Sequence, residues 1–145
     1  MTVLRMLACA SVAAALSAAA HAAQVVEVYK NEGCGCCELW VKHLQKNGFD
    51  VKTQNVPDPD QFRAKFGLPE KLGACHTAVT GGYVIQGHVP VREIKRLLAE
   101  RPKAKGLAVP GMPVGSPGME GDKPQPYDVL LVKPDGTTAI YKSYR

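Results

Sequence analysis

Hydrophobic and polar positions along the chain change their period several times, and these changes predict the order of the secondary-structure elements. β-Branched and apolar residues fill positions 24–30, which predicts a buried strand, and residues 50–56 predict a second one. Between them, apolar side chains at helical spacing predict a helix over residues 37–49, with Gly48 as its stop.

The pattern then continues through two more helices and a pair of strands. A helix is predicted over residues 58–69, two short strands over 76–89, and an amphipathic helix over 89–102. The early β-α-β units imply parallel strands with helices on the faces of the sheet, and the later hairpin adds an antiparallel partner. This order predicts a thioredoxin-like α/β fold, with a central mixed sheet and flanking helices.

The last third of the chain has a different character. Residues 105–126 are rich in Pro and Gly, show no periodicity, and contain Met112 and Met119. A long segment of this kind in a compact domain is usually functional or disordered. After it, two strands that flank Asp135-Gly136 predict a C-terminal β-hairpin.

The N-terminus predicts export. Arg5 precedes an Ala-rich apolar run that ends in Ala20-His21-Ala22, an A-x-A cleavage pattern. We therefore expect residues 1–22 to be a signal peptide cleaved after Ala22, and residues 23–145 to form a single metal-binding domain in the periplasm. A retained N-terminal anchor is the alternative, but the run is shorter than the ~20 strongly apolar residues of a spanning helix, so no stable membrane anchor is expected.

The net charge of +5 does not indicate a nucleic-acid partner. The basic residues gather in residues 92–105, where Glu93 and Glu100 interrupt them and no aromatic residue is available for base stacking. This pattern is typical of a solvated helix face, and no binding to nucleic acid is predicted.

The motif "GCGCC" carries the first candidate chemistry. It lies where the first predicted helix begins, and a helix N-terminus favours the thiolate form of cysteine, which is both nucleophile and metal ligand. Cys34 and Cys37 can meet on one side, whereas Cys36 points roughly 100° away from Cys37 on a helix. A single redox pair has no use for Cys36, but several metal ions bridged by sulfur would. Two structural disulfides are the alternative, but three of the cysteines are crowded into four positions.

A fourth cysteine is expected to face this motif. In thioredoxin-like redox proteins the turn before the third strand faces the C-x-x-C motif and usually carries a cis-proline. Here no proline occurs between Pro69 and Pro90, and Cys75 takes that place. The alternative for Cys75 is a small buried core residue.

Methionine and histidine complete the candidate ligands. Thioethers and thiolates are soft donors that select Cu(I), so a loop with Met112 and Met119 can close a copper site; the alternative is that both side chains pin the loop to the core. His88 ends a strand, where sites commonly form. His76 is a second candidate, although strand alternation would turn it away from Cys75. His43 lies too far along the helix and is expected to be partly buried.

Four stretches together resemble the CopG family of periplasmic copper-resistance proteins: "YKNEGCGCCELWVKHL", "GACHTA", "GYVIQGHVP" and "KGLAVPGMPVGSPGME". The resemblance covers residues 25–145 and implies a thioredoxin-like fold that holds a multinuclear copper cluster, in a protein encoded alongside other copper-handling proteins. It implies a cluster at Cys34, Cys36, Cys37 and Cys75, with Met112 and Met119 as loop ligands.

Three functions are therefore weighed. The first is a periplasmic protein of copper resistance that holds more than one Cu(I) ion in a cysteine-bridged cluster and has other copper-handling proteins as partners. The second is a thiol–disulfide oxidoreductase with Cys34 as nucleophile and Cys37 as resolving thiol. The third is a structural zinc site, although C-x-C-C is tighter than the usual zinc spacing. Enzymatic activity, on copper or on thiols, is left open.

Overall fold

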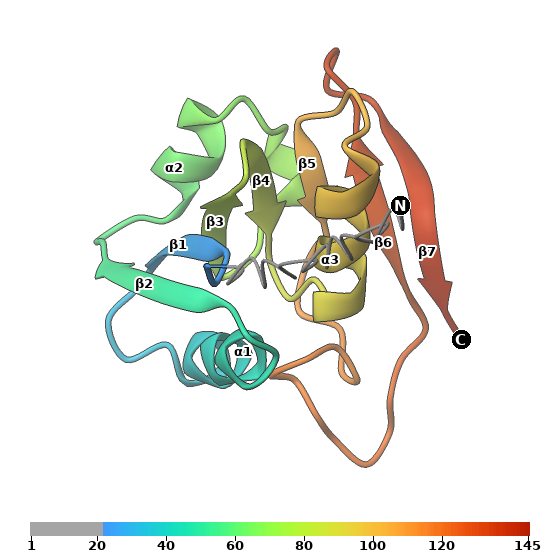
Figure 1. The fold of residues 1–145 in the computed structure, drawn as a ribbon. Coiled ribbons are helices and arrows are strands. Elements are labelled where there is room, and N and C mark those ends of the chain that lie inside the picture. The colour runs from blue at the N-terminus through green and yellow to red at the C-terminus, as the bar shows by residue number, and fades with distance from the viewer. Residues whose placement is uncertain (1–21) are drawn as a thin grey trace, which may run out of the picture.

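The computed structural model describes residues 22–145, which form one seven-stranded mixed sheet with helices on its faces (Figure 1). The strand order is β2-β1-β3-β4-β5-β6-β7. The strands are β1 Val25–Lys30, β2 Asp50–Asn55, β3 His76–Thr80, β4 Tyr83–Gln86, β5 Gly106–Ala108, β6 Tyr127–Val132 and β7 Thr138–Tyr144. The helices are α1 Gly35–Lys46, α2 Asp60–Lys65 and α3 Val91–Glu100, with a 3₁₀ turn η1 at Glu70–Leu72.

The two faces of the sheet bury different sets of residues. Adjacent residues on a strand point to opposite faces, and on β4 Ile85 joins the larger core while Val84 joins the smaller one. Side chains of α1 and α3, including Trp40 and Ile94, fill the larger core, and Leu68 and Leu72 fill the smaller one. The expected thioredoxin-like α/β fold, with its mixed sheet, flanking helices and C-terminal hairpin, is confirmed.

The predicted direction of the third strand is wrong. β1 and β2 are parallel, but β3 runs antiparallel to β1, with His76 opposite Lys30. The six residues of α2 span only about 9 Å at 1.5 Å per residue, too little to carry the chain back along a strand. The chain therefore enters β3 at the end of the sheet where β1 and β2 finish.

The sequence pattern also missed β5. Residues 106–108 were expected to belong to the Pro/Gly-rich loop, yet they pair in parallel with β4 and antiparallel with β6. Three residues are too few to show a period, and Gly106 lies so close to the backbone of Val84 that no Cβ would fit there. The loop proper is thus residues 109–126, and we call it the 109–126 loop.

The 109–126 loop leaves the sheet after β5 and returns to it at β6, passing the end of α1 on the way (Figure 1). α1 itself begins at Gly35, two residues earlier than predicted. Cys36 and Cys37 therefore lie in its first turn.

The predicted signal peptide falls almost wholly on residues 1–21, outside the described part of the chain. Over residues 22–145, no helix has the length and apolar character needed to cross a bilayer.

Candidate metal centre

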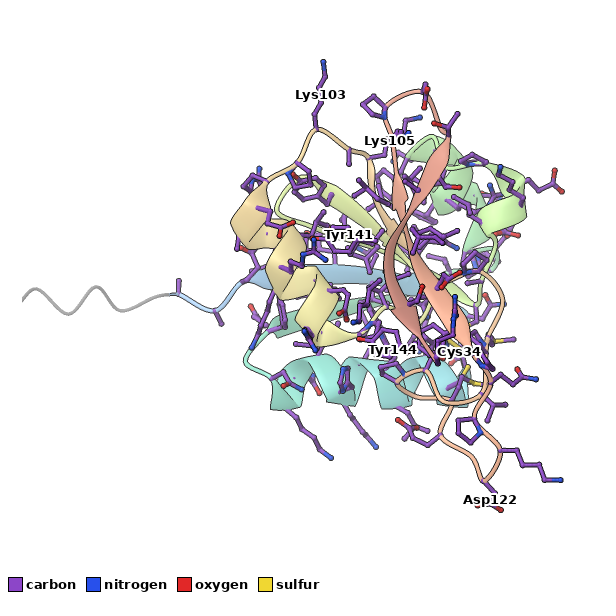
Figure 2. All side chains as sticks on the ribbon, turned by 90° about the vertical axis from the view of Figure 1, so that its right-hand side faces the viewer. Cys34, Lys103, Lys105, Asp122, Tyr141 and Tyr144 are labelled. Carbon is purple, nitrogen blue, oxygen red and sulfur yellow. A yellow bond between two sulfur atoms is a disulfide. The ribbon has the colours of Figure 1, made fainter. Side chains whose placement is uncertain are left out.

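Four cysteine sulfurs converge where α1 begins. Cys34 caps α1, Cys36 and Cys37 occupy its first turn, and Cys75 immediately precedes β3. Their Sγ atoms all lie within 4.8 Å of one another. Cys36 Sγ is 3.6 Å from Cys34 Sγ and 3.7 Å from Cys75 Sγ. The structure thus brings the predicted fourth cysteine to the motif, at the N-terminal end of α1, where Figure 2 labels Cys34.

Cys34 and Cys37 form a disulfide in this structure. Cys37 is fully buried and Cys34 is partly exposed. Among the described cysteines, Cys36 and Cys75 remain free thiols. In this oxidised form two thiols face each other beside the bond, and reduction would present four.

Two histidines complete a second group that shares Cys75 with the first. His88 Nε2 lies 3.0 Å from Cys75 Sγ, and His76 Nδ1 lies 3.4 Å from the same sulfur. The expectation that strand alternation turns His76 away is wrong, because β3 begins at His76 and Cys75 belongs to the preceding turn. Cys75, His76 and His88 have ligand atoms within 4.8 Å of one another.

The surroundings set the protonation of these groups. Burial, together with the neighbouring His88, lowers the pKa of His76 to about 3. Burial likewise lowers the pKa of His88, so both imidazoles are neutral near pH 7. Burial raises the pKa of the Cys75 thiol to about 12, with the neighbouring Cys36 adding to the rise. Cys75 therefore keeps its proton until a cation displaces it.

The hydrogen-bonding capacity of the His76 ring is only partly used by the protein itself. The side chain is completely buried, and its Nε2 has no hydrogen-bond partner within residues 22–145. A buried polar atom without a partner costs free energy. This histidine is therefore not explained by the stability of the fold, and two neutral imidazoles beside several thiols suit a metal ion.

The 109–126 loop brings one of its methionine sulfurs to the cysteines. Met112 Sδ lies 4.0 Å from Cys36 Sγ, and the side chain is about half exposed, at 47%. Met119 is half-buried, and its observed contacts are made by its backbone, which bonds to Ser116 and Gly115. The structure therefore brings Met112 to the sulfur group and shows no such contact for Met119 among the described residues.

Comparison with known proteins agrees with this geometry. A family described as "Protein of unknown function, DUF411" matches residues 72–119. A solved structure named "Copper resistance protein copG- Form 2" is 40% identical, covers 86% of this chain and 100% of its own, and has a TM-score of 0.81. The chain belongs to the CopG family. A second structure of the same name, Form 1, is also 40% identical, covers 85% of this chain and 98% of its own, and has a TM-score of 0.80. No curated protein matches significantly.

The predicted family resemblance is thus confirmed, and this CopG-family chain carries a cysteine and histidine cluster able to bind metal. His43, in contrast, lies apart from the cluster as expected. Its Nε2 accepts the backbone N–H of Val91 at 3.3 Å, and burial lowers its pKa. His43 therefore provides a hydrogen-bond acceptor for the N-terminus of α3.

Sequence reasoning missed two supports of the cluster. The Trp40 ring lies 4.3 Å from the His76 ring, and its Nε1 donates to the Val89 carbonyl at 2.9 Å. Lys30, almost fully buried at the end of β1, pairs with Glu38 in the first turn of α1 at 2.6 Å. A lysine at the end of β1, shortly before the cysteine motif, was the available clue to this second support.

A solvent-facing cavity of about 440 Å³ reaches the sulfurs from one side. It lies between the cysteine motif, the turn before β3 and the segment before α2. Its lining consists of Asn31, Cys34, Pro57, Asp58, Pro59, Asp60, Ala74 and Cys75. The cluster is therefore accessible to a small solute without unfolding.

Proposed function

We propose that this chain is a periplasmic copper-binding protein of copper resistance, which holds Cu(I) in a cluster bridged by cysteine sulfur. The observation that carries the proposal is the convergence of Cys34, Cys36, Cys37 and Cys75 within 4.8 Å, with Cys75 shared by His76 and His88. The names of its 40% identical relatives support copper as the metal.

The donor set supports Cu(I) over zinc. Thiolates and a thioether are soft ligands, and Cu(I) is the soft ion among the metals that imidazole also binds. One tetrahedral zinc ion would use four of these donors. The remaining donors would then have no role, whereas several bridged copper ions would use them.

The Cys34–Cys37 disulfide supports a redox role on copper. Reduction of the disulfide takes two electrons and two protons, which two Cu(I) ions and the solvent supply, and the products are two thiols and two Cu(II) ions. The reverse reaction stores two electrons on copper and closes the bond again. The protein thus protects by changing the oxidation state of copper as well as by binding it.

A second candidate is exchange of disulfides with other proteins. The partly exposed Cys34 and the buried Cys37 favour it, because the exposed sulfur of a C-x-x-C pair is the one that a thiol partner can attack. Cys36, Cys75 and the histidines have no evident part in that reaction.

Location and partners complete the proposal. Residues 1–22 act as a cleaved signal peptide, and the protein exchanges copper with other copper-handling proteins of the periplasm. N-terminal sequencing of the protein recovered from a periplasmic extract tests this, and a chain that retains residues 1–22 in the cytoplasm contradicts it.

The test of function is a Cu(I) titration of the reduced protein without oxygen, against a coloured competing chelator. We expect more than one tightly held copper per chain, and loss of copper in C36S and C75A. The C34S variant tests the second candidate, because a chain without the Cys34 sulfur should lose disulfide exchange with a model substrate. If C36S and C75A bind copper as the parent does, the cluster is refuted.

A further inference from the structure

The side chain of His88 is held from the side opposite to Cys75. Its Nδ1 lies 2.7 Å from the carbonyl oxygen of Pro117, in the 109–126 loop. A carbonyl oxygen only accepts hydrogen bonds, so Nδ1 must carry the hydrogen. A neutral imidazole has one N–H, and Nε2 therefore presents its lone pair to Cys75 at 3.0 Å.

The loop can reach His88 only because residue 118 is a glycine. A Cβ on Gly118 would lie 2.7 Å from the Cys36 carbonyl oxygen, 3.0 Å from the backbone nitrogen of Trp40 and 3.1 Å from His88 Nδ1. The first two of these atoms belong to the backbone of α1 and cannot swing aside. Gly118 also has φ +89°, a left-handed conformation that other residues rarely adopt.

Hydrogen bonds among its own residues hold the turn around Gly118 together. The Gly118 N–H donates to Glu120 Oε1 at 2.9 Å, and the Met119 N–H donates to the Ser116 carbonyl at 2.8 Å. Ser116 is completely buried and its hydroxyl donates to the Pro113 carbonyl at 2.7 Å. A residue that forces the turn away from α1 would therefore carry the Pro117 carbonyl with it.

We propose that Gly118 is a positioning residue, which seats the Pro117 carbonyl on His88 and so fixes the histidine tautomer whose Nε2 is free to bind metal. Metal-ligating histidines generally donate their second N–H to a fixed acceptor, which sets tautomer and ring orientation. In the other tautomer a hydrogen on Nε2 would point at Cys75 and block the site. The consequence for copper rests on the proposed function, but the tautomer does not.

The first test is made on the reduced, metal-free protein. Long-range ¹H–¹⁵N correlation spectra of the histidine side chains distinguish the two tautomers directly. We expect the Nδ1–H form for His88 in the parent and a shift toward the Nε2–H form in G118A. The matched control is G82A, because Gly82 has φ +85° but no atom within 4 Å of its Cβ position. An Nε2–H tautomer in the parent, or an unchanged tautomer in G118A, overturns the proposal.

The second test measures Cu(I) affinity with a competing chelator. G118A should bind copper about 10- to 100-fold more weakly than the parent, and G82A should bind within about twofold. In an H88Q background the G118A substitution should have no further effect, because the histidine through which it acts is gone. An equal loss in both backgrounds means that Gly118 acts elsewhere, and it overturns the proposal.

Two further cases need their own measurements: a G118A variant that does not fold, and a parent protein that binds no Cu(I). If G118A does not fold, E120A loosens the same turn without adding a Cβ and should move the His88 tautomer in the same direction; an unmoved tautomer in folded E120A then counts against the proposal. If the parent binds no Cu(I), the proposed function fails, and the tautomer spectra still decide the role of Gly118.

Discussion

The Sγ atom of Cys75 lies 3.0 Å from Nε2 of His88, because the antiparallel pairing of β3 and β4 brings the residues that flank the hairpin together. This contact joins the sulfur group at the start of α1 to the buried histidines. Within residues 22–145, Cys75 is consequently the one side chain that belongs to both ligand groups. Changes at Cys75 should therefore affect every property of the site.

Copper should stabilise the folded protein strongly. The proposed ligands come from the start of α1, the β3–β4 hairpin and the 109–126 loop, and an unfolded chain cannot hold them together. At a free Cu(I) concentration of 100 times Kd, binding adds about 2.7 kcal/mol to the free energy of unfolding. Scanning calorimetry of the reduced protein should show a higher Tm with Cu(I), and C75A should lose most of the rise. An equal rise in C75A would place the copper elsewhere.

Copper affinity should increase with pH. Since the pKa of Cys75 is raised to about 12, its thiol is protonated throughout pH 6–8, and binding must release that proton. The apparent Kd should thus fall about tenfold per pH unit for each proton released. The pKa of His76 is lowered to about 3, so this imidazole releases none. Chelator competition at several pH values measures the slope, and C75A should have a shallower one. Equal slopes in the two proteins would exclude Cys75 as a ligand.

Copper capacity should depend on the Cys34–Cys37 bond. The oxidised protein offers the thiols of Cys36 and Cys75, whereas the reduced protein offers two more. Metal analysis after desalting should find fewer Cu(I) ions per oxidised chain than per reduced chain. The double variant C34S/C37S is the control, because its capacity should be low and insensitive to reductant. A reductant effect that persists in this variant would point to other sulfurs.

The Lys30–Glu38 pair should be asymmetric in its effect on stability. Lys30 is 3% exposed and Glu38 is 51% exposed. E38A therefore removes the carboxylate from a buried ammonium group, which keeps only the neutral acceptors Asn55 Oδ1 and the Asn31 carbonyl, while K30M leaves a carboxylate that water can solvate. We expect E38A to lower the free energy of unfolding by about 2 kcal/mol, and K30M to cost less. R145A, which breaks the exposed pair with Asp128, should cost less than E38A, because exposed ion pairs add little to stability. Urea unfolding of the three variants checks the order, and a larger loss for K30M than for E38A would refute it.

Element order was predictable because it depends on local patterns. Alternating and helical periods located the helices and the strands other than β5, and the Asp135-Gly136 turn located the final hairpin, where Asp135 accepts hydrogen bonds from Thr137. Placing Cys75 opposite the motif followed from that order together with the known geometry of thioredoxin-like folds, in which the turn before the third strand faces the C-x-x-C motif.

Features that depend on distance were not predictable. The direction of β3 depends on how far the short α2 carries the chain, and the orientation of His76 depends on where β3 begins. In the sequence, nothing distinguishes Gly118 from the other glycines of the Pro/Gly-rich segment. Its requirement appears only when the backbones of the loop and α1 are seen in contact.

Trp40 is the single tryptophan of the chain, and its ring lies 4.3 Å from that of His76. Its fluorescence therefore originates beside the cluster and nowhere else in the protein. Light emitted by this indole will respond to an ion that enters the site, to its oxidation state, and to its removal. The protein carries its own optical probe, with which the proposed loading and release of copper can be followed in real time without a label.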